Sequence, residues 1–153
     1  MVLYYDTFNS PLGHIYVVFN SEGIVRITIG KERFENEYKS CIKKENREAR
    51  AQFNEYFEGK RKKFSLPINF QGTSFQKKVW NALKKIPYGK TCSYEWVAKE
   101  IGKPRASRAV GNAVGANPLP IVIPCHRVIR KNGKLGGYGY GTEMKKRLLE
   151  HEQ

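Results

Sequence analysis

A cysteine followed directly by a histidine is the pair of residues in this chain best suited to covalent chemistry. Cys125 and His126 follow the apolar run Leu119–Pro124, which predicts a buried strand ending at the cysteine. A thiolate is a strong nucleophile, and a neighbouring imidazole can take its proton. Adjacent side chains of a strand point to opposite faces, so contact between the two requires a local turn or a bridging water. The pair predicts nucleophilic chemistry at sulfur, with a carboxylate from elsewhere orienting the imidazole.

Positive charge is concentrated in the same half of the chain. Residues 71–153 carry 16 Lys and Arg against 5 Asp and Glu, or +11 of the total +14, whereas residues 1–70 carry 12 against 9, or +3. Such an imbalance indicates a polyanionic partner, with nucleic acid the first candidate and a membrane surface the second. The alternative is a lysine-rich surface that serves solubility or heat tolerance.

The three cysteines do not form a disulfide framework. Cys41, Cys92 and Cys125 include no CxxC pair and leave one thiol over in any pairing, which indicates a reducing compartment or a reactive thiol. The N-terminus lacks the features of a signal peptide, and no apolar run approaches the roughly 18–20 residues needed to span a bilayer. We therefore expect a cytoplasmic, DNA-associated protein without a membrane partner, in which Cys41 and Cys92 are structural or incidental.

The first 70 residues predict a small β-sheet with a helix. Residues Leu3–Thr7, His14–Phe19 and Ile24–Ile29 are rich in β-branched and aromatic residues and are separated by turn residues. From Lys31 to Gly59 the pattern becomes helical. The expected fold class is α+β, with an N-terminal domain of sheet and helix over residues 1–70 and a mostly helical domain over residues 71–153.

The second domain predicts three helices before the cysteine. Thr73 and Gln76 fit a capping box that opens a helix reaching about Ile86. Helices over Ser93–Ile101 and Ala106–Gly115, joined by a glycine-containing turn, match a helix-turn-helix within a winged-helix-like domain. Small residues in the second helix would allow close approach to a groove. The alternative is a helical hairpin whose small residues pack against its own core.

The longer motifs around the cysteine are specific to one family. IPCHRVI follows Asn-Pro-x-Pro and RAVGNAVGAN, the stretch IPYGKTCSYEWVA precedes them, and the glycine-rich GGYGYG comes before LLEHE. Together these motifs closely resemble the alkylguanine-DNA alkyltransferases, also called methylated-DNA–protein cysteine methyltransferases. The resemblance runs without gaps from about Phe75 to Glu152, whereas the N-terminal half matches only in general character. For residues 1–70 the resemblance implies a ribonuclease-H-like domain.

The resemblance implies a single-turnover reaction on duplex DNA. Cys125 would accept an alkyl group irreversibly from O6 of a flipped-out guanine, with O4 of thymine left open as a further substrate. His126 would deprotonate Cys125 through water, and Glu152 would orient His126. Tyr94 would hydrogen-bond the extruded base and help to protonate the departing guanine. The resemblance implies no cofactor and a monomer, and cooperative assembly on DNA is left open.

Other residues acquire pocket and DNA-binding roles through the same resemblance. Asn117 would be a hinge between the recognition helix and the active-site segment, and Arg108 would be inserted where the guanine left the base stack. Val128 and Tyr138 would line the base pocket, where Gly139 replaces a serine of some relatives, leaving one hydrogen bond to the base in doubt. The remaining candidate DNA contacts are Ser93, Lys103, Arg105, Gly111, Arg127, Arg130 and Lys131.

Several assignments have simpler alternatives. Tyr94 could pack on Trp96, Arg108 could be solvated, and Arg127 could be an ion-pair partner that holds the active-site segment. Glu152 lies one residue from the end and could be frayed. No metal is predicted, because the N-terminal half offers only Cys41 and His14 as soft ligands.

Two other function classes compete with the transferase. The first is a DNA-binding module that recognises lesions or promoters without accepting alkyl groups, for which a thiol at position 125 would be unnecessary. The second is a cysteine hydrolase, which lacks an obvious oxyanion-hole loop and gives no role to the basic half.

Overall fold

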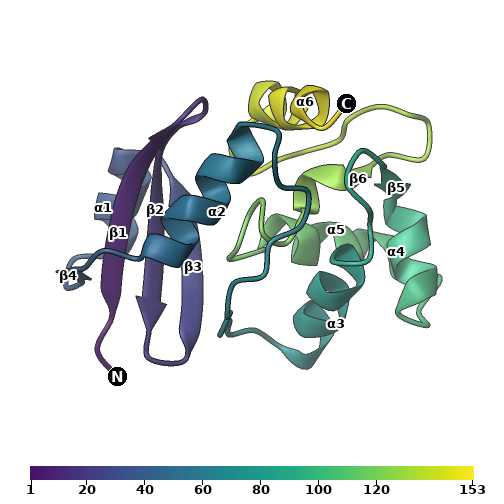
Figure 1. Cartoon of the computed structure of the whole chain (residues 1–153). Coiled ribbons are helices and arrows are strands. Elements are labelled where there is room, and N and C mark those ends of the chain that lie inside the picture. Colours follow the sequence, from purple (N-terminus) through teal and green to yellow (C-terminus); the bar gives the residue numbers. More distant parts are fainter. The chain divides into compact units, whose positions relative to one another are not determined.

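The chain folds into two compact units, and the computed structural model describes all residues from 1 to 153 (Figure 1). The first unit comprises Met1–Gln71 and the second Gly72–Gln153. Helices and strands occur together, as expected for the predicted α+β class. No helix in the chain has the length and apolar character needed to cross a membrane.

A four-stranded sheet forms the centre of the first unit. Strands β1 (Tyr4–Ser10), β2 (Gly13–Asn20) and β3 (Gly23–Ile29) pair antiparallel, and they confirm the three predicted strands. The short strand β4 (Ile42–Lys43) pairs parallel with β1, giving the order β3-β2-β1-β4. Two-residue turns join the antiparallel strands, because such turns follow the natural twist of a hairpin.

The helical region predicted from Lys31 to Gly59 is interrupted. It consists of α1 (Lys31–Glu37) and α2 (Arg47–Phe57), with β4 between them. The free edge of β1 explains the break: the Ile42 amide donates to the Leu3 carbonyl at 3.0 Å, and the Lys44 amide donates to the Tyr5 carbonyl at 2.9 Å. Backbone groups of an edge strand are available for such pairing, and local propensity does not reveal it.

Aromatic residues cover both faces of this sheet. On one face, Phe34 of α1 stacks on Tyr16 with ring centroids 4.2 Å apart. On the other face, Phe53 of α2 lies 5.6 Å from Phe8 and 4.9 Å from Phe64. Side chains alternate between the faces of a strand, so the sheet has a helix on each side.

A buried carboxylate connects the sheet to α2. Asp6 of β1 is almost fully buried, and it accepts hydrogen bonds from the amides of Thr7 at 2.8 Å and Asn46 at 3.0 Å. The Arg50 guanidinium donates to the same carboxylate, with its closest contact at 2.7 Å. Buried carboxylates require such partners, so Asp6 fixes where α2 begins relative to β1.

The second unit is mostly helical. It contains α3 (Ser74–Leu83), α4 (Tyr94–Glu100), α5 (Ser107–Gly115) and α6 (Thr142–His151). A 3₁₀ turn, η1 (Cys125–Arg127), leads into β6 (Val128–Ile129), which pairs parallel with β5 (Cys92–Ser93). Its core is built from the buried residues Val79, Leu83, Val97, Val110, Leu119 and Ile123.

The predicted start of α3 and the helix-turn-helix are both present. Thr73 and Gln76 form the reciprocal capping box, although α3 ends three residues before the predicted Ile86. The connection between α4 and α5 turns at Gly102, whose φ of +76° favours glycine. Trp80 of α3 donates to the Ala113 carbonyl of α5 at 2.8 Å, and this hydrogen bond holds α5 against α3.

We expect Asp6→Ala to destabilise the protein by about 1–3 kcal/mol, because it leaves the partly buried donors of Thr7, Asn46 and Arg50 without their acceptor. Chemical unfolding followed by circular dichroism measures this change. Glu35→Ala is the matched control, since it removes the exposed Lys31–Glu35 pair and should cost about 0.5 kcal/mol or less. Equal effects of both substitutions would contradict the structural role of Asp6.

Candidate active site

Cys125 begins a turn rather than ending a strand. The expected buried strand before it is wrong: Pro120 and Ile123 form only an isolated bridge, and the Ile123 amide donates to the Leu119 carbonyl at 2.8 Å. The chain turns because Ile121 adopts a φ of +75°, which is costly for a β-branched residue. This turn places Cys125 at the first position of η1, so the chain makes a local turn at Cys125 and His126, which is one of the two arrangements considered for contact between them.

Asn117 stabilises this turn. Its side-chain amide donates to the Ile123 carbonyl at 2.8 Å, and its Oδ1 accepts from the Leu119 amide at 3.0 Å. The same side chain acts to lower the pKa of Cys125. Asn117 therefore joins the end of α5 to the cysteine, which is the place that a hinge residue would occupy.

The Cys125 thiol is buried and protonated at neutral pH. Burial raises the pKa of Cys125 above its ordinary value, and this effect outweighs the opposing influences of Asn117, Lys145 and Tyr138. A neutral thiol is a weak nucleophile. The site therefore requires a base that removes the thiol proton when a substrate is present.

His126 has the properties of such a base. Its ring is fully buried, and Nε2 lies 2.8 Å from Oε2 of Glu152. Burial lowers the pKa of His126, with Glu152 opposing this effect, so the imidazole is neutral at pH 7. An ionised carboxylate accepts only, so Nε2 carries the proton, and Nδ1 is left as a buried acceptor without a protein partner.

Arg127 shares the carboxylate of Glu152. Its Nε donates to Oε1 at 2.8 Å, its Nη2 donates to Oε2 at 2.9 Å, and its Nη1 donates to the Ile86 carbonyl at 2.8 Å. The expectation that Arg127 contacts DNA phosphate disagrees with this placement, because the side chain is buried and paired. The alternative of an ion-pair partner describes its position in the structure.

Glu152 is not frayed. It caps the end of α6 and is 3% exposed, although only one residue follows it. The Tyr88 hydroxyl donates to the neighbouring His151 carbonyl at 3.3 Å, and the Arg127 guanidinium lies over the Tyr88 ring at 5.7 Å. These contacts hold the C-terminal residues against the segment after α3.

Lys145 is part of the site and was not predicted from the sequence. Its buried ammonium donates to the carbonyls of Val128 at 2.6 Å, Leu135 at 2.5 Å and Gly137 at 3.2 Å. Burial lowers its pKa to about 8, whereas the charge of Cys125 acts to raise it. A signal was available, since Lys145 lies three residues before the buried Leu148 and so falls on the apolar face of α6.

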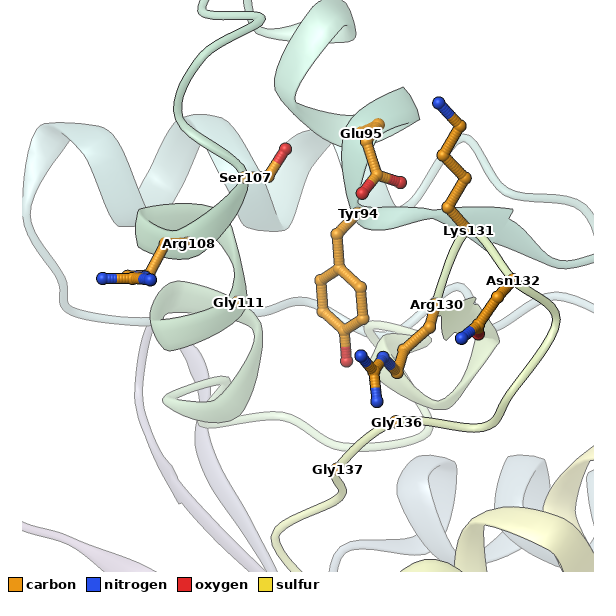
Figure 2. Close-up of a pocket in the computed structure, with 10 residues that line it drawn as sticks. All are labelled: Tyr94, Glu95, Ser107, Arg108, Gly111, Arg130, Lys131, Asn132, Gly136 and Gly137. Atoms are coloured by element: carbon orange, nitrogen blue, oxygen red, sulfur yellow. The ribbon is translucent and has the colours of Figure 1, made fainter.

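A pocket of about 700 Å³ opens beside this cluster, between the helix-turn-helix and the loop after β6 (Figure 2). Of the predicted DNA contacts, it contains Tyr94, Arg108, Gly111, Arg130 and Lys131. The other lining residues are Glu95, Ser107, Asn132, Gly136 and Gly137. Four of these ten residues are charged, and three of the four are cations. The pocket therefore suits an anionic ligand.

Tyr94 is the aromatic residue of this pocket. Burial raises the pKa of its phenol, the charge of Cys125 raises it further, and Arg130 lowers it. The interaction with Cys125 places the phenol within electrostatic reach of the sulfur. Tyr94 begins α4, and the Ser93 hydroxyl caps that helix by accepting from the Trp96 amide at 3.0 Å.

The remaining predicted residues lie around the pocket rather than in its lining. Val128 is buried, and its carbonyl accepts a hydrogen bond from Lys145. Tyr138 acts to lower the pKa of Cys125. Lys103 is exposed and extends over the Phe75 ring at 5.6 Å. Arg105 and Gly139 are also exposed. No group of three His, Cys, Asp or Glu side chains is placed to bind a metal ion.

Comparison with known families gives matches to both units. The family model for the 6-O-methylguanine DNA methyltransferase DNA-binding domain matches residues 74–153. The model for the ribonuclease-like domain of 6-O-methylguanine DNA methyltransferase matches residues 3–70. Together these two matches account for almost the whole chain.

Similar proteins and structures agree with these matches. A methylated-DNA–protein-cysteine methyltransferase of Methanosarcina acetivorans is 47% identical, over 98% of each chain. The constitutive enzyme of Bacillus subtilis is 44% identical, over 98% of this chain and 95% of its own. The crystal structure of Mycobacterium tuberculosis OGT in complex with DNA has a TM-score of 0.88 and 40% identity, over 97% of this chain and 92% of that one.

Lys145→Met tests the buried ammonium. It should destabilise the protein by about 1–3 kcal/mol, because carbonyls of the loop after β6 lose their donor. Lys146→Met, on the exposed side of the same helix, is the control and should change stability little.

The difference in stability between the parent and Lys145→Met should also depend on pH. The folded pKa of about 8 lies below the ordinary 10.5, so the unfolded chain binds more protons between these values. The parent therefore gains stability relative to the variant as pH rises from about 8 to 10.5. A difference that stays constant or shrinks over this range would contradict the assignment.

Proposed function

Because this chain belongs to the 6-O-methylguanine DNA methyltransferase family, we propose that it repairs DNA by moving an alkyl group from O6 of guanine to Sγ of Cys125. The observation that carries this proposal is the buried Cys125 beside a neutral imidazole, which a carboxylate orients. The product is a thioether, which has no good leaving group at neutral pH. Each protein molecule therefore reacts once.

His126 activates the thiol through a water molecule. The Nδ1 atom is buried and has no protein partner, so a water between it and Sγ would complete its hydrogen bonding. The water passes the thiol proton to Nδ1 as the sulfur attacks. Glu152 stabilises the imidazolium that forms, and the two hydrogen bonds from Arg127 hold Glu152 in place.

Tyr94 supplies the proton that the leaving group needs. As the S–C bond forms and the C–O6 bond breaks, the electron pair of that bond remains with the guanine, which takes the Tyr94 proton. The phenolate then recovers a proton from the imidazolium or solvent. The thiol proton is thus replaced by the alkyl group, and the guanine gains one proton, so the reaction is balanced.

Duplex DNA is the partner that fits the second unit. The alkylated O6 lies inside the duplex, so the nucleotide must leave the base stack to reach Cys125, at a cost of a few kcal/mol. Arg108 lies exposed at the start of α5, on the rim of the pocket, where it could occupy the space that the guanine leaves (Figure 2). All of these groups come from one chain, so we propose that the protein acts as a monomer.

Incubation with DNA containing O6-methylguanine should add the mass of one methyl group to the intact protein. The added group should lie on the peptide that contains Cys125, as measured by mass spectrometry. Cys125→Ala should abolish the transfer while leaving DNA binding nearly intact. An unmodified Cys125 after complete loss of the lesion would overturn the proposal.

Arg108→Ala should slow repair of duplex DNA by about tenfold or more while changing the reaction with free O6-methylguanine little, since a free base needs no flipping. Single-turnover rates on the two substrates measure this difference. Arg105→Ala is the control, because Arg105 is exposed just before α5 and does not line the pocket. Equal losses on both substrates would count against the role of Arg108.

A further inference from the structure

Arg130 lies beside the phenol of Tyr94. It follows β6, lines the pocket, and extends its guanidinium toward the Tyr94 hydroxyl (Figure 2). Its backbone is held in a tight turn, because its amide donates to the Lys134 carbonyl and its carbonyl accepts from the Gly133 amide, both at 2.9 Å. The base of the side chain therefore has a defined position, although the side chain itself is exposed.

Gly136 brings the two side chains together. A Cβ at this position would lie 3.2 Å from the Tyr94 hydroxyl oxygen and 3.3 Å from Cγ of Arg130. The phenol and the aliphatic stem of the arginine thus both pack against the bare backbone of Gly136. Its φ of +74° also favours glycine, so the loop is built to allow this close approach.

We propose that Arg130 is a positioning residue for the alkyl transfer, which stabilises the negative charge on the Tyr94 oxygen as Tyr94 gives its proton to the departing guanine. This inference rests on the proposed function of Tyr94. No additional reactant is needed, because the proton still passes from the phenol to the guanine. The guanidinium lowers the free energy of the phenolate that this step leaves behind.

The electrostatic surroundings of Tyr94 make a nearby cation useful. Burial raises the pKa of the phenol, a thiolate at Cys125 raises it further, and Arg130 lowers it. The other charged side chains of the pocket are Glu95, Arg108 and Lys131. In Figure 2 the ends of Arg108 and Lys131 point away from the phenol, so Arg130 is the cation directed at it.

A phosphate contact is the competing role for Arg130, and the free base O6-methylguanine separates the two because it carries no phosphate. We expect Arg130→Gln to slow transfer from this free base by about two- to fivefold, the range for an exposed charge pair. Arg130→Lys keeps the charge and should restore most of the rate. Lys134→Gln is the matched control, because Lys134 is an exposed cation of the same turn that does not line the pocket, and it should leave the free-base rate unchanged.

Combining Arg130→Gln with Tyr94→Phe gives the decisive measurement. The double variant should react with the free base no more slowly than Tyr94→Phe alone, because Arg130 acts through the phenol. A full additional loss in the double variant would overturn the inference, as would a parental free-base rate for Arg130→Gln while Tyr94→Phe remains slow. A parental rate for Tyr94→Phe would overturn the proposed role of Tyr94 and this inference with it, whereas methylation of Cys125 would still establish the transferase.

Discussion

One buried carboxylate organises the reactive part of this protein. One carboxylate oxygen of Glu152 contacts His126, and Arg127 donates a hydrogen bond to each of the two oxygens, with all contacts between 2.8 and 2.9 Å. Removing one partner of such a buried group leaves a charge without compensation, at a cost of about 3–5 kcal/mol. The C-terminal helix, the cysteine turn and the segment after α3 are thereby fixed to one another.

This arrangement explains why the cysteine can be both reactive and protected. Burial raises the pKa of Cys125, so the resting thiol is protonated and reacts slowly with adventitious electrophiles. In the proposed mechanism, reaction requires a bound substrate and the buried acceptor Nδ1 of His126. For a protein that reacts once, a protonated resting thiol keeps the sulfur unmodified until an alkylated base binds.

Local sequence signals predicted the regular elements well, and they failed where partners distant in sequence decide the conformation. The capping box of Thr73 depends on residues three positions apart, and it is present. The interruption between α1 and α2 was missed because it depends on hydrogen bonds to the edge of β1. The expected strand before Cys125 was wrong because the strained Ile121 turn depends on Asn117 and on the surrounding core.

The sequence by itself determined the family, the α+β class, the candidate nucleophile and base, and the basic character of the second half, because these follow from residue types at fixed spacing and from summed charge. Only the tertiary structure decided the roles of cations whose surroundings come from other elements. Arg127 is buried against Glu152, Lys145 is held by three carbonyls, and Arg130 faces Tyr94. The reason is physical: what a charge does depends on its burial and its nearest partners, and the fold brings those partners from distant positions in the chain.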